Sequence, residues 1–265
     1  MSMDPRPLAG VGVLITRPAR QSATFAQRLA TLGGIPFILP ALVIAPPADE
    51  ASLQSALRRL FEFDFALFVS ANAVDAVIAR TPDWPEHLVA IGVGPATADA
   101  LISGGIDNVL TPIERYDSDG VLALPMLQQV GGKRVVLFRG EGAQGETGRG
   151  LMRITLESRG AIVEAITCYR RMRPAIDASA VLESWRQGSI HAVVATSAEV
   201  LDNFIDLIGA AGRPLLASTP LFVPHPRIAA RAQASGLTNV VTTQATDAGL
   251  LAALLHHFAH PQEST

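Results

Sequence analysis

Cysteine is nearly absent from this 265-residue sequence. Cys168 is the only one, so the chain cannot form an internal disulfide. A chain without disulfides suits a reducing compartment, and the start of the sequence has no apolar core of signal-peptide type. No apolar run approaches the length of a membrane span. We therefore expect a cytoplasmic protein that does not bind a membrane.

Charge and aromatic side chains are also scarce. Only 17% of the residues are charged, and the formal net charge is −3. That balance provides no broad basic surface, so we expect no nucleic-acid partner, and any bound anion must be held by local features. Hydrophobic residues make up 49% of the chain. This composition predicts a globular protein with one large or two smaller domains.

The short motifs of common cofactor and metal sites are missing. No G-x-G-x-x-G follows the first strand, the Gly-rich run at 139–150 lacks the order of a P-loop, and no G-x-S-x-G elbow is present. No H-E-x-x-H motif or paired Cys/His spacing indicates a metal site. We therefore predict neither a metal nor an organic cofactor.

Apolar strands alternate with amphipathic helices along the whole chain. Strands are predicted at 10–18, 64–70 and 88–94, each followed by a helical pattern, and a later helix at 118–130 is expected to be capped by Ser118. This alternation predicts parallel sheets with helices on both faces.

The same order of elements occurs twice. Arg139 follows Arg17 by 122 positions, Ser197 follows Ser70 by 127, and Gly236 follows Gly105 by 131. The spacing drifts slowly, as a few loop insertions would cause. The sequence therefore predicts two halves with one α/β plan.

Both halves contain a strand that ends in a small hydroxyl residue and turns at once into a helix. These turns are "FVSANAV" at 68–74 and "ATSAEV" at 195–200. Ligands of open α/β sheets bind at the carboxyl ends of the strands, where helix starts offer free N–H groups to anions. Alternatively, each hydroxyl is only a helix N-cap. The paired occurrence favours a binding role.

Several of these segments together resemble the uroporphyrinogen-III synthase family. They are "VLITRP", "FVSANAV", "IGVGPATADAL", "VLFRGEG", "YRR" and "TSAEVLDNF", in that order, and the resemblance runs from about residue 12 to 258. It implies two similar parallel-sheet α/β domains of flavodoxin or Rossmann type, with the active site in the cleft between them. Domain 1 would be 1–39 plus 173–265 and domain 2 would be 46–166, joined by two linker strands at about 39–46 and 166–174.

The resemblance also implies a reaction. Members of the family close hydroxymethylbilane, a linear tetrapyrrole carrying many carboxylates, to uroporphyrinogen III. They do so without a cofactor, with loss of water and inversion of the last ring, and as monomers. A cytoplasmic two-domain protein that binds a small anion without catalysis is the alternative, because it would use the same paired helix starts.

Tyr169, in "ITCYRR", is the expected catalytic residue. A phenol is protonated at neutral pH and can donate a proton to a departing hydroxyl. Alternatively, Tyr169 only packs its ring and points its hydroxyl at water. The residues expected to bind substrate lie at strand ends and helix starts: Thr16, Arg17, Ser70, Ala71, Asn72, Gly92, Thr97, Arg139, Gly140, Thr196, Ser197, His225 and Arg227. His225 replaces a hydroxyl residue that is common at this turn in the family.

Overall fold

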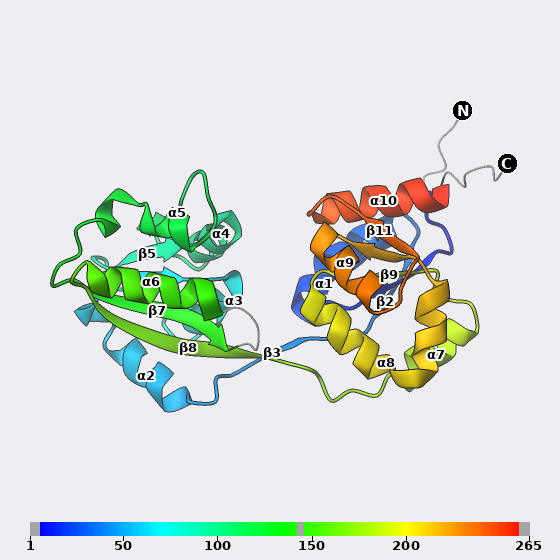
Figure 1. Ribbon diagram of the computed structural model, residues 1–265, viewed down its shortest axis with the longest axis horizontal. Helices are drawn as coiled ribbons and strands as arrows, with labels where there is room; N and C mark the ends of the chain where they lie inside the picture. The colour runs from blue at the N-terminus through cyan, green and yellow to red at the C-terminus, as the bar shows by residue number, and fades with distance from the viewer. Residues whose placement is uncertain (1–5, 142–145, 260–265) are drawn as a thin grey trace. The chain divides into compact units, whose positions relative to one another are not determined.

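The computed structural model describes residues 6–141 and 146–259, and strands alternate with helices along them (Figure 1). The chain forms two compact units. Unit 1 joins Met1–Val43 to Met172–Thr265, and unit 2 is Ile44–Arg171. Within the described residues, none of the helices combines the length and apolar character that a membrane span requires.

Unit 1 contains a five-stranded sheet in the order β11-β10-β9-β1-β2, and all neighbouring strands are parallel. Its strands are β1 (Gly12–Ile15), β2 (Ile35–Ile38), β9 (Ala192–Val194), β10 (Leu221–Val223) and β11 (Val240–Thr242). Its helices are α1 (Ala19–Thr31), α7 (Ser179–Arg186), α8 (Ala198–Ser218), α9 (Pro226–Ala234) and α10 (Asp247–Ala259).

Unit 2 contains a six-stranded sheet in the order β3-β8-β7-β4-β5-β6. Its strands are β3 (Val43–Ala45), β4 (Phe65–Phe68), β5 (Val89–Gly92), β6 (Val109–Leu110), β7 (Arg134–Glu141) and β8 (Ile162–Met172). Its α-helices are α2 (Glu50–Arg58), α3 (Ala71–Ile78), α4 (Pro95–Ser103), α5 (Ser118–Leu122) and α6 (Glu146–Ser158), with short 3₁₀ turns at Leu60–Glu62 and Pro125–Leu127. From β8 to β6, neighbouring strands are parallel.

The two sheets share one strand plan in different chain orders. In unit 1 the spatial order β2-β1-β9-β10-β11 is the 2-1-3-4-5 order of flavodoxin-like folds. Unit 2 repeats it as β8-β7-β4-β5-β6, but there the chain enters at the third strand and adds the first two last. Unit 2 is thus a circular permutation of unit 1. The predicted fold class, two similar parallel-sheet α/β units, is confirmed.

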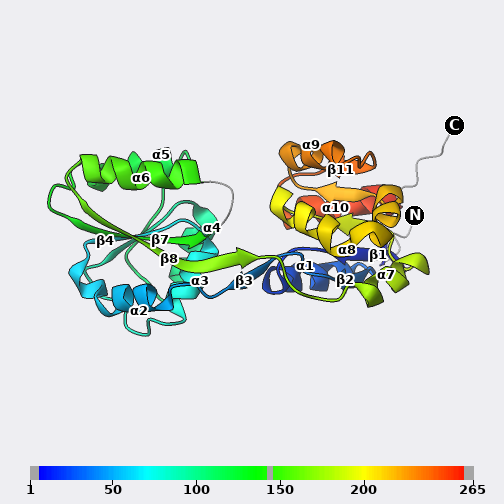
Figure 2. The same ribbon diagram turned by 60° about the horizontal axis from the view of Figure 1, so that its bottom comes forward.

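One face of each sheet is packed by matching side chains. β4 alternates its residues between two cores, and in Figure 2 α5 and α6 lie on one side of unit 2's sheet while α2 and α3 lie on the other. The core under α1 and α10 in unit 1 corresponds to the core under α6 and α5 in unit 2. The matched pairs are Val13 with Val135, Ile15 with Leu137, Phe25 with Met152, Leu29 with Leu156, Phe222 with Ile91 and Leu250 with Val121.

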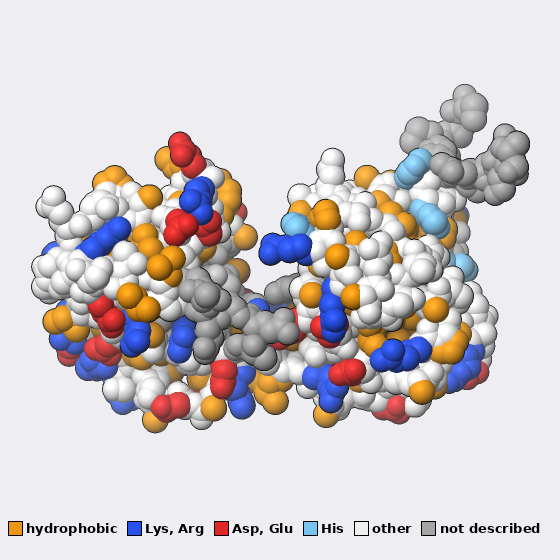
Figure 3. Space-filling model, viewed as in Figure 1, with side chains coloured by type: hydrophobic (Ala, Val, Ile, Leu, Met, Phe, Trp, Pro, Cys, Tyr) orange, Lys and Arg blue, Asp and Glu red, His pale blue; other side chains and the backbone are white. Residues whose placement is uncertain are grey.

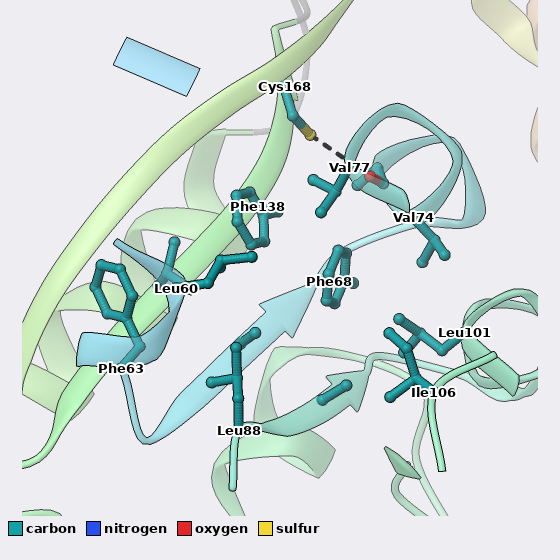
Figure 4. Packing of buried hydrophobic residues seen from close by; sticks show 14 of the residues in the cluster. Leu60, Phe63, Phe68, Val74, Val77, Leu88, Leu101, Ile106, Phe138 and Cys168 are labelled. Atoms are coloured by element: carbon teal, nitrogen blue, oxygen red, sulfur yellow. Dashed lines mark hydrogen bonds between the residues drawn. The ribbon is translucent and has the colours of Figure 1, made fainter. Parts of the chain in front are cut away.

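The opposite face of unit 2's sheet holds an aromatic core (Figure 4). Phe68 stacks on Phe138 of the neighbouring strand, with ring centroids 5.1 Å apart. Cys168 and Tyr169, on β8, belong to the same core. This packing places the end of β8 beside the turn that follows β4.

The chain passes from one unit to the other at 43–44 and 171–172, inside the two expected linker runs. Residues 166–170 lie inside unit 2's sheet, because β8 keeps pairing with β7 as far as Glu141 opposite Arg170. β3 lies at the edge of the same sheet, beside β8. A strand that can complete backbone hydrogen bonds stays in the sheet, since unpaired buried N–H and C=O groups are costly.

Charged side chains join the amino ends of unit 2's strands. Arg59 donates two hydrogen bonds to Glu164, of 3.1 and 2.9 Å, and Arg134 bridges Glu62 and Glu164. The hydrogen bond from Arg59 lowers the pKa of Glu164. On the face drawn in Figure 3, basic side chains are similarly mixed with acidic ones. These cations are therefore already neutralised, at the edge opposite the strand-end turns.

The packing of α6 gives a test of this fold. Leu156 is fully buried between α6 and the sheet, so Leu156→Ala should lower the free energy of unfolding by about 2–5 kcal/mol. Leu151 on the same helix is 42% exposed, and Leu151→Ala should change stability by less than about 1 kcal/mol. Urea titrations of both variants measure this difference. Equal midpoints would contradict the burial of this face of α6.

Candidate functional site

The turn after β4 begins helix α3 with a serine cap. Ser70 has extended backbone angles, and its Oγ accepts a hydrogen bond from the N–H of Ala73 at 3.3 Å. Ala71 and Asn72 form the first turn of α3 and are partly buried. The start of α3 therefore lies at the carboxyl edge of unit 2's sheet, where ligands of such sheets bind.

Tyr169 reaches this turn from β8. Its side chain is only 3% exposed, and its hydroxyl lies 3.0 Å from Ser70 Oγ. The packing part of the alternative agrees with this position, and the catalytic role of Tyr169 stays a prediction. The ring packs in the core, as a packing residue would, but the hydroxyl bonds to Ser70 and does not point at water.

A missing side chain at Gly140 makes room for the tyrosine ring. A Cβ built on Gly140 would lie 2.3 Å from Tyr169 Cζ and 2.7 Å from its hydroxyl oxygen. Gly140 pairs with Tyr169, whereas Arg139 pairs with Thr167, so Cys168 is an extra residue on β8. Such a bulge re-aims the side chains that follow it. It brings the tyrosine ring over Gly140 and the hydroxyl to Ser70.

The two hydroxyls together can donate one proton outward. The pair has two O–H hydrogens, and one of them lies between the two oxygens. If Ser70 donates to Tyr169, the phenol O–H is left for a third acceptor. The positive end of α3 then favours negative charge on the nearby oxygens. This arrangement can perform acid catalysis at the sheet edge.

The turn after β9 in unit 1 is built like the turn after β4. Ser197 caps α8, and its Oγ accepts a hydrogen bond from Val200 N–H at 3.1 Å. Thr196 precedes it and is partly buried. Both predicted hydroxyl turns are therefore N-caps, and a cap also presents the first N–H groups of its helix. The cap and the binding role do not exclude each other.

A histidine caps helix α9. His225 Nδ1 accepts a hydrogen bond from the N–H of Arg227 at 3.1 Å, which is the bond that a serine or aspartate cap would make. His225 and Arg227 are both exposed. The imidazole at this turn thus replaces a hydroxyl in its capping role.

Thr16 and Arg17 are occupied by contacts within unit 1. Thr16 is fully buried and donates its hydroxyl hydrogen to the carbonyl of Val194 at 2.8 Å. Arg17 makes a two-pronged ion pair with Asp247, with distances of 2.7 and 3.3 Å, and its guanidinium lies 4.7 Å from the Phe25 ring centroid. These contacts tie β1 to β9, α1 and α10. Substrate binding by Thr16 and Arg17 stays a prediction.

Gly92 and Thr97 serve close packing at the start of α4. A Cβ on Gly92 would lie 2.9 Å from the backbone nitrogen of Ala98, so the absence of a side chain lets α4 approach β5. Thr97 is buried in the first turn of α4. Both residues lie at the carboxyl edge of unit 2's sheet, beside the Ser70 turn.

The sequence reasoning missed two residues near these turns. One is Asp247, the partner of Arg17, which is the second residue of the "TDAG" segment that answers "SDG". Cys168 was counted only for redox state, yet its extra position in β8 aims Tyr169. Among the described residues, no group of three or more His, Cys, Asp or Glu side chains could hold a metal ion.

Comparison with known proteins identifies the family. The family model described as uroporphyrinogen-III synthase HemD matches residues 23–252. The chain is 31% identical over 202 residues to the uroporphyrinogen-III synthase of Escherichia coli strain K12, which covers 75% of this chain and 80% of that protein. It is 32% identical over 211 residues to the enzyme of Synechococcus elongatus, which covers 78% of each chain. The chain belongs to the uroporphyrinogen-III synthase family.

Solved structures of uroporphyrinogen-III synthases share the fold. The Helicobacter pylori synthase aligns with a TM-score of 0.60 at 12% identity, covering 92% of this chain and 98% of that one. A mutant synthase from the thermophile Thermus thermophilus aligns with a TM-score of 0.55 at 18% identity, covering 92% and 97%. At such identities the likeness supports the architecture and leaves the roles of individual residues to the geometry above.

Gly140 provides a test of the tyrosine position in this synthase. Gly140→Ala would place a Cβ inside the Tyr169 ring, so the ring must move and its hydroxyl must leave Ser70. We expect stability to fall by about 1–3 kcal/mol and formation of uroporphyrinogen III to slow by about ten-fold or more. Gly150 in α6 has open space around its Cβ position, so Gly150→Ala is the control and should preserve both the stability and the rate. An unchanged rate in a folded Gly140→Ala protein would contradict the assignment.

The buried thiol gives a second, chemical test. Burial raises the pKa of Cys168 from 9.0 to about 12. The folded protein should therefore resist Ellman's reagent at pH 8, and the protein unfolded in guanidinium should react at once. The raised pKa contributes stability in full below about pH 9, and this contribution is lost as the pH rises toward 12. Fast labelling of the native protein would show that β8 does not pack as described.

Proposed function

We propose that this chain closes hydroxymethylbilane to uroporphyrinogen III, with inversion of the last ring and loss of water. Family membership supports this reaction over non-enzymatic anion binding. The observation that carries the mechanism is the hydrogen bond between Tyr169 and Ser70 at the start of α3. This bond supports a proton-donor role for the Tyr169 hydroxyl, because it lies at the edge of the sheet where ligands of this fold class bind.

Departure of the substrate hydroxyl begins the reaction. Tyr169 donates a proton to that oxygen, the C–O bond breaks, and water leaves behind a cationic azafulvene. Ser70 and the positive end of α3 stabilise the tyrosine oxygen while it carries negative charge. The electron-rich last ring then attacks through its substituted carbon and forms a spiro intermediate. This intermediate fragments and recloses inverted, and the final aromatisation returns the proton to Tyr169.

The carboxylates of the substrate need donors that do not require a basic surface. The first turns of α3 and α8 present backbone N–H groups beside Ala71, Asn72 and Thr196. Such groups bind carboxylates without side-chain charge, which is consistent with the net charge of −3. Favouring the inverted closure a hundred-fold over the spontaneous one needs only about 3 kcal/mol of differential stabilisation.

A double-mutant cycle tests the acid role. Tyr169→Phe keeps the ring and removes the donor, so we expect near-normal stability, an isomer III rate reduced at least about ten-fold, and more isomer I from spontaneous closure. Ser70→Ala, the second single variant of the cycle, should lower the free energy of unfolding by about 1 kcal/mol, because it removes the cap of α3. If Ser70 acts through the phenol, the double variant should be no slower than Tyr169→Phe.

The measurement is separation of isomers I and III after incubation with freshly made hydroxymethylbilane. Tyr116, the second tyrosine, is 56% exposed, and Tyr116→Phe is the matched control with an expected wild-type rate. A Tyr169→Phe protein that turned over at the wild-type rate would leave Tyr169 with a packing role alone.

A further inference from the structure

The internal repeat allows Arg17 and Arg139 to be compared atom for atom. Each lies two residues after a matching strand position: Ile15 of β1 pairs with Val194 in unit 1, and Leu137 of β7 pairs with Leu67 in unit 2. In unit 1 both terminal nitrogens of the arginine are engaged, while its Nε, like that of Arg139, is buried without a hydrogen-bond partner. Asp247 takes both terminal nitrogens, and Phe25 lies against the guanidinium plane.

In unit 2, different residue types stand at the positions that correspond to both partners. The N-caps of α10 and α5 show which residues of the two units correspond. Thr246 Oγ1 accepts a hydrogen bond from Gly249 N–H at 3.0 Å, and Asp117 Oδ1 accepts one from Gly120 N–H at 2.9 Å, so Thr246 corresponds to Asp117. Ser118, expected to cap α5, is therefore the first helical residue and corresponds to Asp247. Its hydroxyl replaces a carboxylate. The core alignment likewise replaces Phe25 with Met152.

Arg139 is left without a counter-ion among the described residues. It is partly buried, no described residue makes an ion pair with it, and its Nε is buried without a hydrogen-bond partner. The two acids that flank Ser118 form ion pairs elsewhere, since Arg115 holds Asp117 and Asp119 at 2.8 Å each. A partly buried guanidinium without an anion is costly. This guanidinium lies at the ligand-binding edge of the sheet, where the carboxylate of a ligand would supply the missing charge.

We propose that Arg139 binds a side-chain carboxylate of the tetrapyrrole at the carboxyl end of β7, beside Tyr169 and Ser70. This inference rests on the proposed function and assigns the two repeated arginines different tasks. Arg17 fastens α10 to the sheet through Asp247, whereas no described side chain forms an ion pair with Arg139, and a guanidinium matches the two oxygens of a carboxylate. The two units differ at the position held by Asp247 in unit 1 and Ser118 in unit 2. We infer that this difference gives Arg17 a structural role and Arg139 a binding role.

Arg139→Gln and Arg17→Gln form the paired test. Arg139→Gln should raise the KM for hydroxymethylbilane about ten-fold or more with little change in melting temperature, because it removes a charged contact made only with substrate. Arg139→Lys should recover part of the loss, since it restores the charge without the fork. Arg17→Gln should lower the melting temperature clearly and raise KM less. A folded Arg139→Gln protein with wild-type KM would overturn the inference.

Binding of uroporphyrin III, the stable oxidised product, separates this inference from the proposed function. Fluorescence titration of wild type and Arg139→Gln needs no turnover. Weaker binding by the variant supports the carboxylate contact even if wild type forms no isomer III, an outcome that would reject the proposed function alone. Equal dissociation constants would reject the Arg139 contact even if the enzyme is active.

Installing the missing acid gives a converse test. Ser118→Asp should give Arg139 the partner that Asp247 gives Arg17, so the melting temperature should rise and binding of uroporphyrin III should weaken. Ser118→Asn, which has similar volume without charge, is the control. Combining Ser118→Asp with Arg139→Gln should remove the gain in stability. If the gain persisted in that combination, Arg139 would not be the group that lacks a partner.

Discussion

The position of the proposed acid depends on a side chain that is absent. The Tyr169 ring occupies the space in which a Cβ on Gly140 would lie, and only this close approach brings the hydroxyl to Ser70. The extra residue Cys168 in β8 sets the register that makes the approach possible. Core packing holds the ring, the start of α3 holds the serine, and the chemistry needs both. A small change in either strand would therefore separate the two oxygens without unfolding the sheet.

The two units show how a repeated fold can divide its tasks. Their cores match side chain by side chain, although unit 2 follows the strands in permuted order. Matched packing fixes the sheet edges, and the residues beyond the strands are then free to differ. In unit 1 the side chains of Thr16, Arg17 and Asp247 at this edge bond to groups within the same unit. In unit 2 the corresponding edge carries the hydroxyl pair of Ser70 and Tyr169, and Arg139 has no ion-pair partner among the described residues.

Much of the fold could be predicted from the amino-acid sequence. The alternation of elements indicated the parallel sheets, and the spacing of Ser70 and Ser197 located both helix starts. Other details were wrong or missed for physical reasons. Ser118 was expected to be the N-cap of α5 because hydroxyl residues favour that position. The N–H of Gly120 instead donates to Asp117, whose charged carboxylate is the stronger acceptor. Composition also does not report that residues 166–170 find a partner strand in β7.

Local pattern determined what depends on neighbours in sequence: which segments are strands or helices, where helices begin, and that two halves share one plan. Periodicity and capping act over a few residues, so they are readable in the chain itself. Only the tertiary structure decided that Tyr169 meets Ser70 across 99 positions, and that Arg17 has a partner 230 positions away while Arg139 has none among the described residues. Those outcomes depend on strand order, register and a bulge. These contacts are set by the packing of segments that are distant in sequence, and local propensity does not depend on that packing.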